Sequence, residues 1–102
     1  MGIDVRDATD RHRYEVSFDG ELAGFAVYRD VGGVRVFTHT EVFPRFERRG
    51  VGSRLARGAL EDVRATGRSL VPQCPFIRAY IDRHDAYADL IDADLAARLS
   101  RD

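Results

Sequence analysis

The spacing of hydrophobic residues changes at Pro44, and this change constrains the fold more than any other feature of the chain. Before Pro44, apolar and polar residues alternate over Arg13–Phe18, over a segment that begins at Leu22, and over Val34–Phe43. Such alternation is typical of half-buried strands. After Pro44, apolar residues recur at helical spacing from Ser53 onward. The chain is therefore predicted to form strands first and then to alternate between helix and strand.

Two turn signals separate the predicted strands. Asp19-Gly20 directly follows the first long strand, and Asp-Gly favours the two-residue turns that join antiparallel strands. Gly32-Gly33 stands before the third long strand. A short strand over Ile3–Val5 is also expected. The first half of the chain is therefore predicted to be an antiparallel meander.

The second half predicts a helix followed by a short buried strand. The helix begins at Ser53 and ends before Gly67, a residue type that commonly follows a helix end. Its apolar residues lie on one stripe: Leu55, Ala56, Ala59, Leu60 and Val63. Ser69–Val71 is predicted to be a strand, which Pro72 and Pro75 prevent from continuing.

Two helical segments are predicted at the end of the chain. The first has Phe76, Ile77, Tyr80 and Ile81 at helical spacing and breaks at His84-Asp85; the second, short one has Leu90, Ile91, Leu95 and Leu99. Strand–helix–strand crossovers are right-handed and make their two strands parallel. The predicted fold is α+β, with a mixed, mostly antiparallel sheet and a β-α-β-α C-terminal half.

Length, charge and cysteine content limit the class of protein. A chain of 102 residues fits one domain over residues 1–102. A net charge of -1 argues against a nucleic-acid binder, which usually has a basic excess. The apolar runs are too short for a membrane-spanning helix, and the polar N-terminus is unlike a signal peptide, so we expect a cytoplasmic protein. The single cysteine, Cys74, excludes an internal disulfide.

The segment RRGVGSRLARGAL, Arg48–Leu60, connects the meander to the first predicted helix. The first N–H groups of a helix lack intrahelical partners, and the helix dipole adds positive potential there, so this end can bind an anion. Gly50 and Gly52 allow close backbone approach, and Arg48 and Arg49 add charge. The same pattern also fits a plain turn, and from the loop alone both interpretations stay open.

These features together resemble the GNAT N-acetyltransferase superfamily, and in particular its small YjdJ-like branch. The resemblance runs from about Tyr14 to Leu90. It is carried by the motifs HTEV at 39–42, GVG at 50–52 and CP at 74–75, and by Tyr80 and His84. It implies splayed parallel strands, acetyl-CoA as co-substrate, and an amine acceptor, either a small molecule or a protein.

In that superfamily a Gln/Arg-x-x-Gly-x-Gly/Ala loop binds the pyrophosphate of acetyl-CoA through backbone N–H groups. The matching segment here is 47–52, and Glu47 stands where the family has Gln or Arg. The resemblance implies a cofactor-binding set of Val42, Arg48, Arg49, Gly50, Val51, Gly52 and Ser53, with the Val42 backbone on the pantetheine arm. The chain has no room for the two helices that often help to form the acceptor site, so we expect that site to be open or shared with a partner.

Acetyl transfer to an amine requires a base, because an amine with a pKa near 10.4 is almost entirely protonated at pH 7. Glu41, on the strand that enters the loop, is the first candidate, and His39 on the same side of the strand is the alternative. Both residues are also compatible with a solvent-facing role on the sheet surface.

Cys74 and Tyr80 are the other catalytic candidates. Cys74 ends the strand that should splay from Val34–Phe43, and it is interpreted as a nucleophile, as a group polarising the thioester, or as a small buried residue. By resemblance Tyr80 protonates the leaving thiolate; its helical spacing with Phe76 favours the alternative, a core tyrosine. His84 is interpreted as a helix-end residue.

Three functions follow from these residues: an acetyl-CoA-dependent N-acetyltransferase, a non-catalytic CoA-binding or acyl-CoA-binding module, and an interaction domain whose Gly-x-Gly is only a turn. The first accounts for most of the motifs and is the predicted function. No metal is expected, because His12, His39 and His84 lack the spacing of metal ligands.

Overall fold

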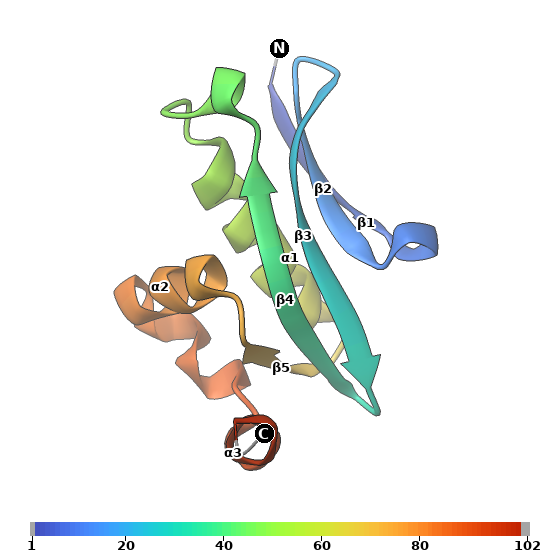
Figure 1. Ribbon diagram of the computed structural model, residues 1–102, viewed down its shortest axis with the longest axis vertical. Helices are drawn as coiled ribbons and strands as arrows, with labels where there is room; N and C mark the ends of the chain where they lie inside the picture. Colours follow the sequence, from blue (N-terminus) through green and yellow to red (C-terminus); the bar gives the residue numbers. More distant parts are fainter. Residues whose placement is uncertain (1, 101–102) are drawn as a thin grey trace.

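A computed structural model describes residues 2–100 of the chain (Figure 1). It has a five-stranded sheet whose order is β1-β2-β3-β4-β5. The strands are β1 (Ile3–Ala8), β2 (Arg13–Phe18), β3 (Glu21–Val31), β4 (Val34–Val42) and β5 (Ser69–Pro72); the helices are α1 (Val51–Ala65), α2 (Pro75–Arg83) and α3 (Ala93–Leu99), with short 3-10 turns at 9–11, 44–46 and 85–90. No described helix has the length and apolar character needed to cross a membrane.

The sheet confirms the predicted topology. Strands β1 to β4 pair antiparallel in sequence order, and α1 then crosses over so that β5 pairs parallel to β4. Asp19 and Gly20 both have positive φ, 49° and 87°, which is the geometry of the two-residue hairpin turn that the Asp-Gly sequence predicts. Gly32 turns β3 into β4 at φ 60°.

Several element boundaries differ from the prediction. Strand β1 extends to Ala8 rather than Val5, because it pairs with β2 over its whole length. Strand β4 ends at Val42. Helix α1 begins at Val51, two residues earlier than expected, because Gly50 adopts a left-handed conformation (φ 76°) and supplies the turn into the helix. The break at His84-Asp85 is confirmed, and a 3-10 turn follows it.

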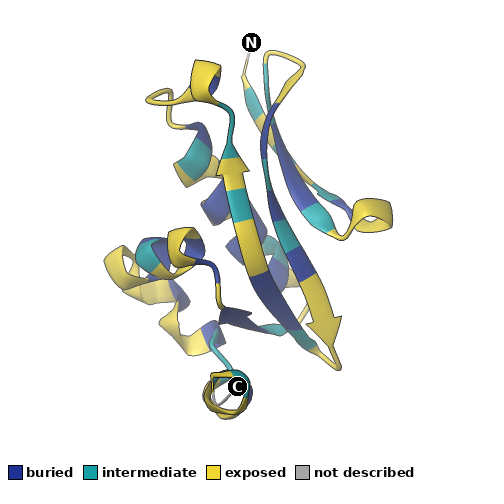
Figure 2. Cartoon of the chain, in the orientation of Figure 1, coloured by how far each residue is buried: buried dark blue, intermediate teal, exposed yellow. Residues whose placement is uncertain are grey.

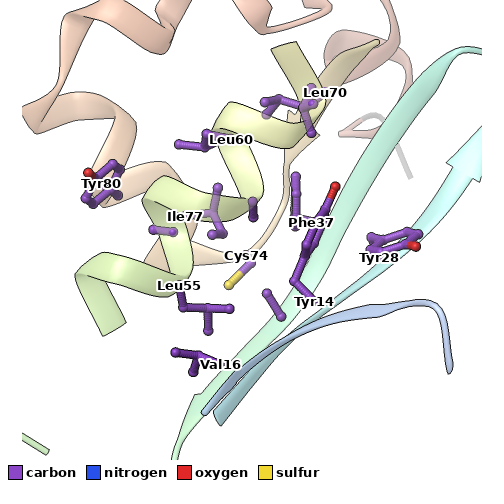
Figure 3. Packing of buried hydrophobic residues seen from close by; sticks show 14 of the residues in the cluster. Tyr14, Val16, Tyr28, Phe37, Leu55, Leu60, Leu70, Cys74, Ile77 and Tyr80 are labelled. Carbon is purple, nitrogen blue, oxygen red and sulfur yellow. The ribbon is translucent and has the colours of Figure 1, made fainter. Parts of the chain in front are cut away.

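The main core lies between the sheet and α1 (Figures 2 and 3). The five apolar residues predicted for the stripe of α1 are all fully buried. They pack against inward side chains of the strands, including Tyr14, Val16 and Phe37, and against Ile77 and Tyr80 of α2. Helix α3 lies on the other face of the sheet, where Leu95 packs on Val36 and Val71. The remainder of that second face carries no helix among the described residues.

A buried arginine in the sheet departs from the simple alternation of apolar and polar positions. Arg35 points into the core, where its guanidinium donates to Asp30 at 2.9 Å and to the Tyr14 hydroxyl at 2.8 Å. Its Cζ lies 3.8 Å from the centre of the Tyr28 ring. Hydrogen bonding to Arg35 holds the pKa of Asp30 below its usual value. The core tolerates the charge of Arg35 because the fold supplies hydrogen-bond partners for its guanidinium group.

Glu15 is the second buried charge, on the opposite face of the same sheet. Its side chain is 7% exposed and forms ion pairs with Arg6, Arg11 and Arg13. Burial raises the pKa of the Glu15 carboxyl, but the hydrogen bond from Arg13 and the three positive charges outweigh burial and hold the pKa below its usual value of 4.5.

We predict an acid-dependent loss of stability that involves Glu15. Because the pKa of this carboxyl is lower in the folded chain, the unfolded chain takes up its proton first as pH falls. This contribution to the free energy of unfolding is complete above pH 4.5 and decreases as pH is lowered further. Urea unfolding across a pH series measures it. Glu15→Gln is expected to be less stable at neutral pH and to lose less on acidification; a loss as steep as that of the wild type would contradict the assignment.

Candidate active site

Strands β4 and β5 part at the middle of the sheet. Their parallel pairing ends at Phe37 and Pro72, and the last link is the N–H of Cys74, which donates to the carbonyl of Phe37 at 3.0 Å. Strand β4 continues to Val42 without β5 beside it, while the chain turns away into α2 (Figure 1). The part of β4 after Phe37 thus has a free edge inside the fold, on the side of α2.

The hydrogen-bonding pattern fixes which backbone groups face this free edge. The N–H of Phe43 donates to the carbonyl of Ala23 on β3 at 2.9 Å. Backbone groups alternate in direction along a strand, so Glu41 also directs its N–H and C=O toward β3. Thr40 and Val42 direct theirs toward the free edge. A ligand lying in the gap can pair with them as an added strand would.

A bulge on β4 determines which side chains face each side. Val27 is opposite His39 but Tyr28 is opposite Phe37, so Thr38 is an extra residue on β4. The extra residue reverses the alternation of the following side chains. Beyond it, Thr40 faces the core, where its hydroxyl accepts a hydrogen bond from Cys74 Sγ at 3.0 Å. Without the bulge, the two candidate bases would face the core.

Glu41 and His39 instead lie together on the exposed face of the sheet. The side chains are 50% and 61% exposed, and His39 Nε2 lies 3.4 Å from Glu41 Oε1. The structure thus brings the two predicted bases side by side, on the part of β4 that does not pair with β5.

The loop before α1 has the backbone geometry of an anion site. Gly50 is the N-cap of α1 at φ 76°, and no described side chain caps it. Val51, Gly52 and Ser53 form the first turn, whose N–H groups have no partner within the helix; the first intrahelical bond joins Arg54 N–H to Gly50 C=O at 3.2 Å. Arg48, also at positive φ (65°), helps to form the turn.

A groove of about 370 Å³ joins this helix end to the end of β4. Pockets of this size hold small ligands. It is lined by Val42, Phe46, Glu47, Arg48, Gly50, Val51, Gly52, Ser53, Phe76 and Arg83. Six of the seven residues predicted to bind the cofactor therefore line one groove. The seventh, Arg49, places its guanidinium 5.5 Å from the Phe18 ring and does not line the groove.

Two groove residues come from α2 and were missed from the sequence. Phe76 stands at helical spacing with Ile77 and Tyr80, which are buried, yet it is 37% exposed because its ring faces the groove. Arg83, at the end of the same helix, adds a positive charge opposite the loop. Phe76 and Arg83 are seven residues apart, a spacing that places both on one helix face; this spacing was the available signal.

Cys74 lies directly beneath the gap between the strands. It is 3% exposed, and Figure 3 shows its sulfur among buried side chains such as Leu55. Tyr80 is buried as well and stacks on His84 with ring centres 4.0 Å apart. His84 closes the C-terminal end of α2, as predicted. Within residues 2–100, no three His, Cys, Asp or Glu side chains converge in a way that would hold a metal ion.

The comparisons with known proteins agree with this geometry. A family model described as GCN5-related N-acetyl-transferase matches residues 13–90. The chain belongs to the GCN5-related N-acetyltransferase family. It is thus an acyltransferase, and the matched region is the one that the sequence motifs indicate. A search of curated proteins finds no match.

A solved structure supports the fold separately. The chain is similar to the NMR solution structure of a GCN5-like protein from Staphylococcus aureus, with a TM-score of 0.65. The two chains are 19% identical, and the match covers 87% of each. At this identity the similarity concerns the fold.

We predict that Gly52→Ala weakens CoA binding and leaves stability nearly unchanged. A methyl group at residue 52 would lie 2.8 Å from Phe76 Cζ and 3.5 Å from Val42 Cγ2. The exposed ring can turn aside, and alanine favours helix, but methyl and ring then occupy the groove. Calorimetric titration is expected to show about tenfold weaker binding. Arg57→Ala, on the exposed side of α1, is the control; unchanged affinity in Gly52→Ala would contradict the groove as the CoA site.

Proposed function

We propose that this acetyltransferase moves an acetyl group directly from acetyl-CoA to an amine. The observation that carries the proposal is the continuity between the free edge of β4 and the groove at the start of α1. The edge offers backbone pairing and the helix start offers anion binding. Together they match the two chemically different parts of CoA, its amide-containing pantetheine arm and its pyrophosphate.

The pyrophosphate is assigned to the N–H groups of Val51, Gly52 and Ser53. These groups and the helix dipole favour an anion at this end. Arg48 and Arg83 flank the groove with positive charge, and both line it. Glu47 also lines it, and its carboxylate opposes the anion. Binding therefore depends chiefly on backbone groups and on the two arginines.

The pantetheine arm is assigned to the gap beside Thr40 and Val42. Its amide groups can pair with the N–H and C=O groups that β5 leaves free. This position brings the thioester close to the level of Thr40 and Cys74, where the strands part. Developing negative charge on the thioester oxygen requires a hydrogen-bond donor, and backbone N–H groups of β4 are the nearest candidates.

The amine is proposed to approach from the exposed face that carries Glu41 and His39. Glu41 attracts the ammonium form and accepts its proton, directly or through water. The neutral nitrogen then attacks the thioester carbonyl, the C–N bond forms, and the C–S bond breaks. The departing CoA thiolate takes up a proton. Tyr80 is the proposed donor for that proton. It is buried like Cys74, but a proton donor needs only a hydrogen bond to the departing sulfur, whereas a nucleophile must reach the acetyl carbon itself.

Cys74 is proposed to polarise and position the site rather than to carry the acetyl group. Its sulfur is buried and donates to the Thr40 hydroxyl at 3.0 Å. A nucleophile needs a thiolate with access to its substrate, and a 3% exposed cysteine has little access. The contact instead fixes Thr40 on the segment that borders the thioester.

CoA binding is the first test of this proposal. A ligand that binds only the folded chain raises its apparent stability, so saturating CoA should raise the melting temperature. Acetyl-CoA turnover with a panel of amines then measures the reaction. Absence of any thermal shift at saturating CoA would refute the proposed donor.

We predict that Cys74→Ala retains CoA binding and lowers the transfer rate. The variant loses the hydrogen bond to Thr40 but leaves the groove intact. The thiol is a weak hydrogen-bond donor, so the loss of this bond is expected to lower kcat by a few-fold, up to about tenfold. Thr40→Val removes the same bond from its other end and should show a similar drop. Loss of all activity in Cys74→Ala with a normal rate in Thr40→Val would instead indicate covalent catalysis.

We predict that Glu41→Gln lowers kcat. Glutamine keeps the size of the side chain but cannot accept a proton, and general-base catalysis contributes about a hundredfold or more. His39→Gln is the matched comparison, since His39 lies beside Glu41 and is also well exposed. If His39→Gln has the larger effect and Glu41→Gln has none, the base is His39.

A further inference from the structure

The sheet face that carries the proposed base also carries a row of side chains across four strands. The strand pairing places Glu41 opposite Phe25, Phe25 opposite Glu15, and Glu15 opposite Arg6. Helix α1 packs on the other face, and α3 packs only at the end near β5 (Figure 1). The row is an open strip that begins beside the proposed thioester position and ends at β1.

The β1 and β2 end of the strip is positively charged. Arg6, Arg11 and Arg13 approach the Glu15 carboxylate to 2.9, 3.4 and 2.7 Å. Three guanidinium groups thus share one carboxylate. Arg6 and Glu15 line a surface hollow together with Asp4, which forms no ion pair among the described residues. The three arginines still outnumber the two carboxylates, so this end of the strip has a net positive charge. Arg6 and Arg11 are 69% and 59% exposed, so unused N–H donors face solvent.

An aromatic ring connects this end of the strip to the proposed base. The Arg13 guanidinium lies 4.4 Å from the centre of the Phe25 ring, a cation–π distance. The Phe25 and His39 ring centres are 6.1 Å apart. Two strand spacings, roughly 10 Å, separate Glu41 from the cluster around Glu15. The strip therefore has a negative group beside the reaction, an apolar middle, and a positive far end.

We propose that this strip binds the acceptor and that the acceptor is a small amine carrying a carboxylate roughly 10 Å from the reacting nitrogen. The ammonium lies at Glu41, the carbon chain crosses Phe25, and the carboxylate receives hydrogen bonds from Arg6 and Arg11. A diamine or polyamine would place a second cation among the arginines, which disfavours it. The proposal rests on the proposed function, because it specifies the acceptor of that reaction.

Binding of matched amines to the CoA-loaded protein tests this assignment without turnover. Omega-amino acids of increasing chain length, alkylamines of the same lengths and the corresponding diamines are titrated, and backbone amide shifts are followed by NMR. The amino acid of matching length is expected to bind about three- to tenfold more tightly than its alkylamine, with shifts at Phe25, His39 and Glu15. Added salt should reduce the difference.

A double variant, Arg6→Gln with Arg11→Gln, should abolish the preference for the carboxylate while retaining CoA binding. Arg13 is left in place to keep Glu15 paired, and Arg57→Gln on α1 is the control that keeps the preference. Equal binding of amino acids and alkylamines to the wild type, or an unchanged preference in the double variant, would overturn the proposal. Failure of CoA to bind would instead refute the proposed function. In that case, titration of the same amino acids and alkylamines onto the CoA-free protein would still test whether the strip prefers a carboxylate.

Discussion

The parting of β4 from β5 is the constraint on which the rest of the site depends. Parallel pairing stops at Pro72, which has no N–H to offer a neighbouring strand, and Cys74 makes the last bond to β4. The following residues turn into α2 while β4 continues. A strand that continues alone retains unpaired N–H and C=O groups, and such groups are costly to bury unless they find partners. The fold thus contains a backbone edge that is suited to a ligand with amide groups.

The bulge at Thr38 converts this edge into a site with two distinct sides. By reversing the alternation of side chains, it directs Thr40 toward Cys74 and the core, and it directs His39 and Glu41 toward solvent. The proposed donor then occupies the gap and the groove at α1, while the acceptor approaches across the open sheet. Separate access of the two substrates fits direct transfer, because neither must leave before the other enters.

The strand order, both hairpin turns and the buried stripe of α1 could be predicted because they depend on local spacing and on turn residues such as Asp19-Gly20. The loop at Gly50 and Gly52 was identified for the same reason. The bulge could not be predicted, since nothing in the residues around Thr38 distinguishes an extra residue from a regular strand. Arg35 and Glu15 were not expected to be buried, because strand pairing and side-chain packing, and not the local spacing of apolar residues, bring their charged partners to them. The spacing of Phe76 gave no sign that its ring would face a groove and stay exposed, since the groove forms only where α2 meets the start of α1.

The central claim is that one continuous site, from the free edge of β4 to the start of α1, binds acetyl-CoA. An NMR titration of the whole chain with CoA measures this most directly through the backbone amides. We expect the largest shifts at the N–H groups of Thr40, Val42, Val51, Gly52 and Ser53, with protection of the two β4 amides from hydrogen exchange. Shifts confined to other surfaces, such as the hollow beside Arg54 and Arg57, would contradict it.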